Sequence, residues 1–332
     1  MDFTELIDLV SEKLGGAVLV ANDEFFAPKE NLLKATPPIF LEGEYTDRGK
    51  WMDGWETRRR RTPGYDWCII RLGLPGIIRG VMVDTSYFRG NYPEHCSLEA
   101  CAFEGQPTAE DLTNESAKWI PILPQLPLAG DTQNPFPIKS EDRFTHLRLK
   151  IYPDGGVARL RVYGEVLPDW NKLRSLGGNI DLAAVENGGL VLGCSDMFFG
   201  HRHNLIMPGK ALNMSDGWET KRRRGPGHDW VIIKLGAPGR VRRVEVDTSY
   251  FRGNFPESCS LDASNAVGLT LESLTDLSVA WNNILPRTKL QAHTRHFFDQ
   301  ELLDSGRVSH LHFNIFPDGG VSRLRVYGEM AE

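Results

Sequence analysis

The sequence predicts an all-β protein made of two tandem homologous jelly-roll β-sandwich domains with short helices. Two observations lead to this prediction. Three long blocks of sequence occur twice, so the chain holds two copies of one unit. Within each copy, short apolar or alternating runs bounded by glycine and proline outnumber helical patterns, as is typical of sandwiches and jelly rolls.

The repeated blocks are long and nearly identical. They are DGWETRRRRTPGYDWCIIRLG (53–73) with DGWETKRRRGPGHDWVIIKLG (216–236), VDTSYFRGNYPEHCSLEA (83–100) with VDTSYFRGNFPESCSLDA (246–263), and THLRLKIYPDGGVARLRVYGE (145–165) with SHLHFNIFPDGGVSRLRVYGE (309–329). A weaker pair, 15–32 with 188–205, aligns only if the first copy carries ten extra residues within about 32–52. The repeat is far longer than a solenoid unit of roughly 20–50 residues. Each copy is therefore a whole domain.

The domain boundaries follow from this repeat. We expect a first domain at 1–168, a linker at 169–181 and a second domain at 182–332. A chain of 332 residues suits two domains of roughly 150 residues each. The polar, glycine-containing stretch at 168–179 has the composition of a linker.

The strands are predicted from runs in the first copy. They are WCIIRLG (67–73), GVMVDTSYF (80–88), CSLEACAF (96–103), THLRLKIY (145–152) and VARLRVYGE (157–165). In 145–152, Leu147, Leu149 and Ile151 share one face. The turn residues 153–156 then predict a β-hairpin between the last two strands. Helices are predicted at Thr4–Leu14 and, more weakly, near 182–187.

Composition excludes several classes of protein. The net charge of −6 argues against a nucleic-acid binder, and no apolar run approaches the ~18 residues of a membrane helix. The N-terminus does not resemble a secretory signal. The chain has five cysteines and no CxxC, HExxH, GxSxG, P-loop or dinucleotide motif. We therefore expect a cytoplasmic protein with reduced thiols and no certain cofactor, although a divalent metal ion stays open.

The loop after the second predicted strand, VDTSYFRGN (83–91, repeated at 246–254), carries polar side chains in both copies. One interpretation is structural: Asp84 caps a turn, and Arg89–Asn91 forms a tight turn with positive φ. The other is a ligand loop, in which Arg89 holds a carboxylate and Asn91 binds an amide. Glu94 supplies a carboxylate three residues later. The residue types favour the structural interpretation.

The other charged repeats also have two interpretations. The predicted hairpin places Lys150 opposite Arg159 and Arg148 opposite Arg161, so something anionic should lie between them. In the second copy, Asn314 faces Arg323. The run 58–61 is expected to be a solvated face or to pair with Asp53 or Glu56. The only histidines that the copies share are His146 and His310.

Several repeated apolar residues are expected to serve packing alone. Cys96 and Cys259 each begin a predicted strand, and unpaired cysteine is commonly buried. Trp55 and Trp67, with their counterparts Trp218 and Trp230, are interpreted as packing anchors.

DGWETRRRR, VDTSYFRGNYPE and PDGGVARLRVYGE, present in tandem, closely resemble the allantoicase (allantoate amidinohydrolase) family across nearly the whole chain. The resemblance implies two jelly-roll domains of the galactose-binding-like type and a homo-oligomer. It also implies a hydrolase of carbon–nitrogen bonds in linear amidines, which converts allantoate and water to ureidoglycolate and urea during purine (allantoin) catabolism. No membrane or nucleic-acid partner is implied.

This substrate needs a cation for its carboxylate, amide partners for its two ureido groups, and acids or bases for proton transfer. We predict Arg89 as the carboxylate clamp and Asp84 or Glu94 as the acid or base, with roles in proton transfer or binding also for His146, Asn91 and Arg159. The second-copy counterparts are equivalent or vestigial: the catalytic candidates Asp247, Glu257 and His310, and the binding candidates Arg252, Asn254 and Arg323.

Two other readings of the sequence stay open. In the first, the chain is a non-catalytic pair of sandwich modules that binds a small sugar or ureido ligand. In the second, only one repeat is catalytic and the other builds the oligomer.

Overall fold

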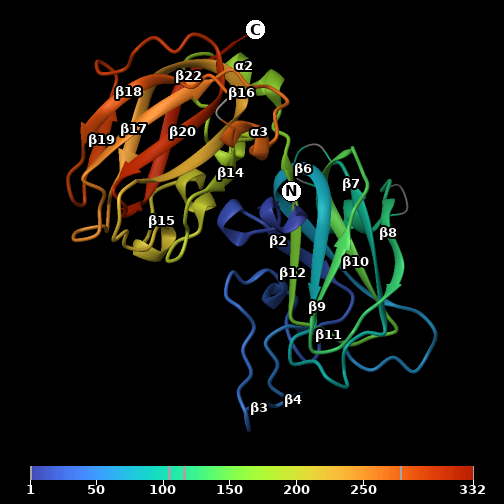
Figure 1. The fold of residues 1–332 in the computed structure, drawn as a ribbon. Helices are drawn as coiled ribbons and strands as arrows, with labels where there is room; N and C mark the ends of the chain where they lie inside the picture. The colour runs from blue at the N-terminus through green and yellow to red at the C-terminus, as the bar shows by residue number, and fades with distance from the viewer. Residues whose placement is uncertain (1, 104, 106, 115–116, 277–278, 332) are drawn as a thin grey trace. The chain divides into compact units, whose positions relative to one another are not determined.

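The computed structural model describes residues 2–331 apart from 104, 106, 115–116 and 277–278 (Figure 1). It divides into two compact units, residues 1–167 and 168–332. Antiparallel strands dominate both units, which confirms the all-β class. Within the predicted linker, helix α2 (Trp170–Leu176) precedes β13 (Ile180–Asp181), and the linker bounds stay a prediction. No helix in the described part of the chain is long and apolar enough to cross a bilayer.

The main sheet of unit 1 is organised around one long strand, β6 (Asp66–Asp84). The strand order is β1 (Ile7–Asp8), β12 (Arg159–Val166), β6, β10 (Arg143–Tyr152), β7 (His95–Cys101) and β8 (Ile120–Pro127). Outside this order, β2 (Ala17–Ala21) and β9 (Gln133–Pro137) also pair with β6. The first part of β6 pairs with β10 and β2, and its last part pairs with β12 and β9. One strand therefore joins the two halves of the jelly roll.

Short elements complete unit 1. They are the 3-10 helices Phe3–Glu5, Glu12–Leu14 and Lys29–Leu33, the strands β3 (Tyr45–Thr46), β4 (Gly49–Lys50), β5 (Trp55–Glu56) and β11 (Gly156–Val157), and helix α1 (Ala109–Thr113). The strands β3 and β4 pair with each other inside the segment that is extra in the first copy. Figure 1 shows this hairpin extending away from the main sheet of unit 1.

Unit 2 repeats the topology. Its sheet order is β13, β22 (Arg323–Met330), β16 (Asp229–Asp247), β20 (Val308–Phe316), β17 (Ser258–Ser264), β18 (Asn282–Lys289), with β14 (Leu190–Cys194) and β19 (Arg295–Phe298) also on β16. The strands β15 (Trp218–Glu219) and β21 (Gly320–Val321) pair with each other. Helix α3 (Leu271–Thr275) and the 3-10 helices Val185–Asn187, Arg202–Ile206 and Met214–Asp216 complete it.

The predicted burial pattern of the strands is confirmed. Leu147, Leu149 and Ile151 on β10 are fully buried, as their alternation requires. The thiols of Cys96 and Cys259 are buried as predicted, and Trp55 and Trp218 are buried anchors whose indole N–H groups donate to the carbonyls of Asp23 and Asp196. Trp67 and Trp230 are only partly buried, and each packs against a cluster that includes a residue of α1 or α3.

Three local predictions are wrong. The strands β10 and β12 do not form a hairpin, because both pair with β6 and the connection between them forms β11, which pairs with β5. Arg159 therefore lies opposite Asp84, not Lys150. The segment 4–14 is not one helix, since it contains β1 between two short 3-10 helices. The segment near 182–187 holds only the 3-10 turn Val185–Asn187.

Candidate functional site

A groove of about 470 Å³ opens beside the loop that follows β6 in unit 1. Two of the predicted site residues, Arg89 and Asn91, line it. The full lining is Phe26, Phe40, Lys50, Met52, Glu56, Tyr87, Arg89, Gly90 and Asn91. Two cations, a carboxylate and an amide thus meet aromatic side chains in one depression.

The loop that carries Arg89 is fixed at its base. The Phe88 N–H donates to Thr85 O at 2.9 Å, so the tight turn lies earlier than predicted, and the positive φ belongs to Tyr87 (φ 70). Such a conformation costs a bulky residue about 1–3 kcal/mol unless the surroundings hold it. Phe88 is buried against Gly156, where an added Cβ would lie 1.9 Å from Phe88 Cε1. The packing therefore holds the turn in place.

Asp131 holds the outer part of the same loop. Its Oδ1 accepts from Tyr87 N at 2.7 Å, and its Oδ2 lies 2.9 Å from Arg89 Nε. The hydrogen bond from the Tyr87 N–H lowers the pKa of Asp131, and Arg89 adds to this effect. The Arg89 side chain is 79% exposed, so its ion pair is weak and exchangeable. This ion pair engages Nε, so the terminal nitrogens of Arg89 can still hold a carboxylate.

Glu56 and Asn91 form a hydrogen-bonded polar pair in the groove lining. Asn91 Nδ2 donates to Glu56 Oε1 at 2.7 Å. Burial raises the pKa of Glu56, and the hydrogen bond from Asn91 offsets part of this rise. A partly buried carboxyl with a raised pKa beside an amide is suited to exchanging protons with a bound molecule.

The remaining wall comes from the extra segment of the first copy. Lys50 Nζ lies 4.4 Å from the centre of the Phe40 ring, and Phe40 stacks on Tyr87 with ring centres 5.8 Å apart. The buried pair Arg159–Asp53 (2.6 Å) anchors this segment, because Arg159 Nε donates to Thr36 O at 3.0 Å and Asp53 Oδ2 accepts from Ile39 N at 3.1 Å. Arg159 thus holds this wall segment in place.

Three other predicted residues of unit 1 do not line the groove. Asp84 is buried and accepts from Ser86 N at 2.8 Å, which is the turn cap of the structural interpretation. Glu94 is exposed, and its main-chain carbonyl accepts from Leu128 N. His146 is buried in β10, and burial lowers its pKa to about 4. Their catalytic roles stay predictions.

Unit 2 keeps the loop but not the wall. Asn254 donates to Glu219, and Tyr250 repeats the positive φ (71). His293 replaces Asp131 as the acceptor from the Tyr250 N–H, so Arg252 lacks the matching carboxylate. The segment with Phe40 and Lys50 has no equivalent, because nine residues (207–215) replace nineteen (34–52).

The other predicted site residues of unit 2 lie in different parts of the domain. Exposed Glu257 pairs with Arg287 at 3.2 Å. His310 is buried, and burial lowers its pKa to about 4. Asp247 and Arg323 line a second cavity, on the unit-2 sheet.

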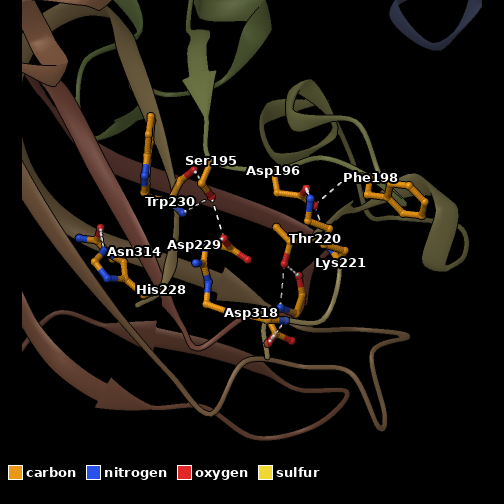
Figure 2. Close-up of polar contacts among 12 residues, drawn as sticks. Ser195, Asp196, Phe198, Thr220, Lys221, His228, Asp229, Trp230, Asn314 and Asp318 are labelled. Atoms are coloured by element: carbon orange, nitrogen blue, oxygen red, sulfur yellow. Dashed lines mark hydrogen bonds and ion pairs between the residues drawn. The ribbon is translucent and has the colours of Figure 1, made fainter. Parts of the chain in front are cut away.

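The arginine runs have a structural role. Arg58 pairs with Asp23 and Arg60 with Asp66. The predicted ion-paired face is therefore confirmed, but the predicted partners Asp53 and Glu56 are wrong. Figure 2 shows the corresponding network in unit 2, where Asp196 Oδ1 accepts from the N–H groups of Phe198 and Lys221.

The outward cations of β10 have an anionic partner from the same chain. Glu99 on β7 accepts from both Arg148 and Lys150, with the Lys150 contact at 2.6 Å. In the described ranges, no group of three or more His, Cys, Asp or Glu side chains is arranged to hold a metal ion.

The sequence did not single out the other groove residues as functional candidates, among them Phe40, Lys50, Glu56 and Tyr87. The ten-residue difference between the copies was the available signal, because a segment present in only one repeat is free to serve one site. Nothing in the sequence placed this segment beside residues 87–91.

Comparisons with known proteins agree with the repeated architecture. A family model described as the allantoicase repeat matches residues 7–167 and 180–331. An allantoicase of Dictyostelium discoideum is 51% identical over 97% of this chain and 87% of its own length, and a probable allantoicase of Pseudomonas aeruginosa is 49% identical over 98% and 96%. A crystal structure of allantoicase from Saccharomyces cerevisiae is 37% identical, with a TM-score of 0.80 over 97% of this chain and 93% of its own.

Proposed function

The chain belongs to the allantoicase family, and we propose that the groove of unit 1 is where it binds and cleaves allantoate. The activity is that of a hydrolase, which converts allantoate and water to ureidoglycolate and urea. One observation supports this groove above all: Arg89, Asn91 and Glu56 line the same cavity, and the extra segment adds Phe40 and Lys50 to its wall.

Substrate binding uses the two cations and the amide. The carboxylate of allantoate pairs with Lys50 and with the terminal nitrogens of Arg89, whose Nε keeps its contact with Asp131. The ureido groups present N–H donors and carbonyl acceptors, which Asn91 and Glu56 can match. Phe40 and Tyr87, whose rings stack, line the groove and limit the water that it holds.

The proton transfers are assigned to Glu56. Protonated Glu56 donates its proton to the nitrogen of the leaving ureido group, so the bond from the central carbon breaks and urea departs. The lone pair of the other ureido nitrogen stabilises the cation that remains. Water then adds to the carbon and returns a proton to Glu56, which gives ureidoglycolate and restores the acid. Such proton transfer is typically worth about 10²–10⁴-fold in rate.

Paired variants in the two repeats test this assignment. Glu56→Gln should lower kcat for urea release by about 10²-fold or more. Arg89→Lys should lower kcat/KM by about 10–100-fold, because a lysine cannot form a bidentate pair. Glu219→Gln and Arg252→Lys make the same changes in unit 2, where the wall is missing, and should change both constants less than threefold, roughly the limit set by surface substitutions. Equal losses in both repeats would contradict the assignment, and allantoate binding without urea release by the unaltered chain would indicate a binding module.

We also propose that the chain works in the cytoplasm as a homo-oligomer. The buried thiols of Cys68, Cys96, Cys101 and Cys259 are not in disulfides, which suits a reducing compartment. Phe198, Phe199 and Leu212 are large apolar side chains exposed at 60% or more, as at interfaces between subunits. Sedimentation equilibrium, compared with the chain mass of 37.3 kDa, tests the oligomer.

A further inference from the structure

The second cavity, on the unit-2 sheet, has a volume of about 330 Å³ and differs in chemistry from the groove. Its lining is dominated by charged groups. Among them are the guanidinium groups of Arg295, Arg323 and Arg325 and the carboxylates of Glu186, Glu245 and Asp247. Arg323, Arg325, Glu245 and Asp247 are each at least nine-tenths buried.

Several polar atoms of this lining are buried and lack a hydrogen-bond partner in the described chain. They are Arg323 Nε, Arg325 Nη1 and Glu186 Oε2. Arg325 Nη1 lies 3.6 Å from Asp181 Oδ2, which is longer than a hydrogen bond. Buried donors and acceptors are nearly always satisfied in folded proteins. Two guanidinium donors and one carboxylate acceptor are therefore left unsatisfied among the residues that line this cavity.

Unit 1 shows what fills the equivalent place. There Arg159 Nε donates to Thr36 O at 3.0 Å, Arg159 Nη2 donates to Pro37 O at 3.4 Å, and Arg161 Nη2 donates to Lys34 O. These carbonyl oxygens belong to the extra segment. In unit 2 the shorter segment brings two carbonyls to Arg325, from Met207 and Gly209, and leaves Arg323 Nε without an acceptor. The cavity thus lacks oxygen atoms that the first repeat supplies from its own main chain.

Three of the charged groups that line the cavity are also specific to unit 2. Glu186, Glu245 and Arg295 correspond to Lys13, Met82 and Gln133 in unit 1. Glu245 and Arg295 pair at 2.7 Å on adjacent strands, and Arg295 lies opposite Asp247 in the register. Carboxylates therefore lie beside guanidinium groups, so a complementary ligand must itself carry both an oxyanion and N–H donors.

We propose that this cavity is a second binding site, for a small molecule that carries a carboxylate and a ureido or amide group. Its carboxylate pairs with the guanidinium groups of Arg323 and Arg325, and its N–H groups donate to the carboxylate of Glu186. The site goes beyond the proposed catalytic groove and does not depend on that groove being catalytic. Acids with a ureido group, which include the substrate and the product of this enzyme, belong to the ligand class.

Calorimetric titration of the full chain with hydantoate (N-carbamoylglycine) tests the proposal. Hydantoate has one carboxylate and one ureido group and lacks the second ureido group that leaves in the reaction. The titration uses an Arg89→Ala background, which disables the groove. We expect one hydantoate per chain in this background, and at least tenfold weaker binding of acetate and of methylurea, which each carry half of the recognised chemistry.

Two variants locate the bound molecule. Glu186→Gln keeps the side-chain size, and the double change Glu245→Met with Arg295→Gln installs the residues of unit 1 and removes an ion pair without leaving an unpaired charge. Each should weaken hydantoate binding about tenfold or more, the usual effect of losing a charge-assisted contact. Lys13→Gln, at the equivalent place in unit 1, is the control and should change nothing.

No hydantoate binding in the Arg89→Ala background, binding that the cavity variants leave unchanged, or acetate binding as tight as hydantoate binding would each overturn the proposal. Measuring urea release distinguishes a failure of this proposal from a failure of the groove assignment. If Arg89→Ala keeps full activity while the cavity variants lose both hydantoate binding and urea release, the groove assignment fails and the cavity proposal stands.

Discussion

At the scale of single residues, Glu56 is the group whose environment sets the chemistry. Burial raises the pKa of its carboxyl, and the hydrogen bond from Asn91 favours the charged form and limits that rise. If protonated Glu56 is the acid, activity must fall as the pH rises through this raised pKa.

Replacing Asn91 with leucine should therefore move the alkaline limb of the pH profile. Asn91→Leu removes the hydrogen bond that stabilises the carboxylate, so the pKa of Glu56 rises further and the decline in kcat/KM begins at a higher pH. The pH dependence of urea release measures this shift, and Asn254→Leu in unit 2 should leave the profile unmoved. A limb that stays in place in Asn91→Leu would show that Glu56 is not the titrating acid.

At the scale of elements, the sequence pattern predicted which faces are buried but not which strands are neighbours. The alternation in 145–152 correctly placed Leu147, Leu149 and Ile151 in the core, because a period of two follows from local geometry. The hairpin failed because strand partners depend on the path of the whole chain. In this jelly roll the nineteen-residue β6 pairs with both strands that were expected to pair with each other.

The same limit applies to the candidate site. Arg89 and Asn91 were found because they are charged or amide residues in a loop that both copies share. Glu56 and the wall residues Phe40 and Lys50 reach the groove through long-range packing, namely the pairing of β5 with β11 and the anchoring of the extra segment by Arg159. Neither contact leaves a periodic signal in the sequence.

The extra segment itself can be exchanged between repeats. Replacing residues 34–52 with the nine residues 207–215 removes Phe40 and Lys50. The chimera should still fold, because in unit 2 the short segment already lies beside the Asp216–Arg323 pair, which is equivalent to Asp53–Arg159. Urea release should fall by about 10²-fold or more, since substrate positioning is lost. Circular dichroism should show an unchanged β-rich spectrum, and full activity in this folded chimera would exclude a role for the wall.

At the scale of the whole molecule, each repeat buries one histidine in the same strand position. His146 Nδ1 lies 2.8 Å from Thr145 Oγ1, and His310 Nδ1 lies 2.9 Å from Ser309 Oγ. Burial lowers the pKa of both to about 4, from an ordinary value of 6.5. The unfolded chain then binds more protons than the folded chain between about pH 4 and 6.5, so these histidines make stability rise with pH across that window.

A double variant isolates this effect from the other titrating groups. Asp8 and Asp181, whose pKa burial raises to about 6, act in the opposite direction. The free energy of unfolding of the unaltered chain, minus that of His146→Leu/His310→Leu, should therefore increase from pH 4 to 6.5 and stay level above it. Urea denaturation at a series of pH values gives both quantities. A difference that does not vary with pH would mean that folding leaves the pKa of both imidazoles unchanged.

The unequal length of one connection has a consequence for how duplicated domains diverge. The strands of the two units have the same order, and an equivalent arginine, Arg159 or Arg323, begins the last long strand of each unit. In unit 1 the connection is long, so its main-chain oxygens accept from Arg159 and its residues Phe40 and Lys50 line the groove. In unit 2 the connection is short, and Arg323 Nε has no acceptor in the described chain, so a small molecule from solution can take that place. A change in the length of one surface connection, together with a few substitutions beside it, thus gives two duplicated domains different binding properties while their strand topology stays the same.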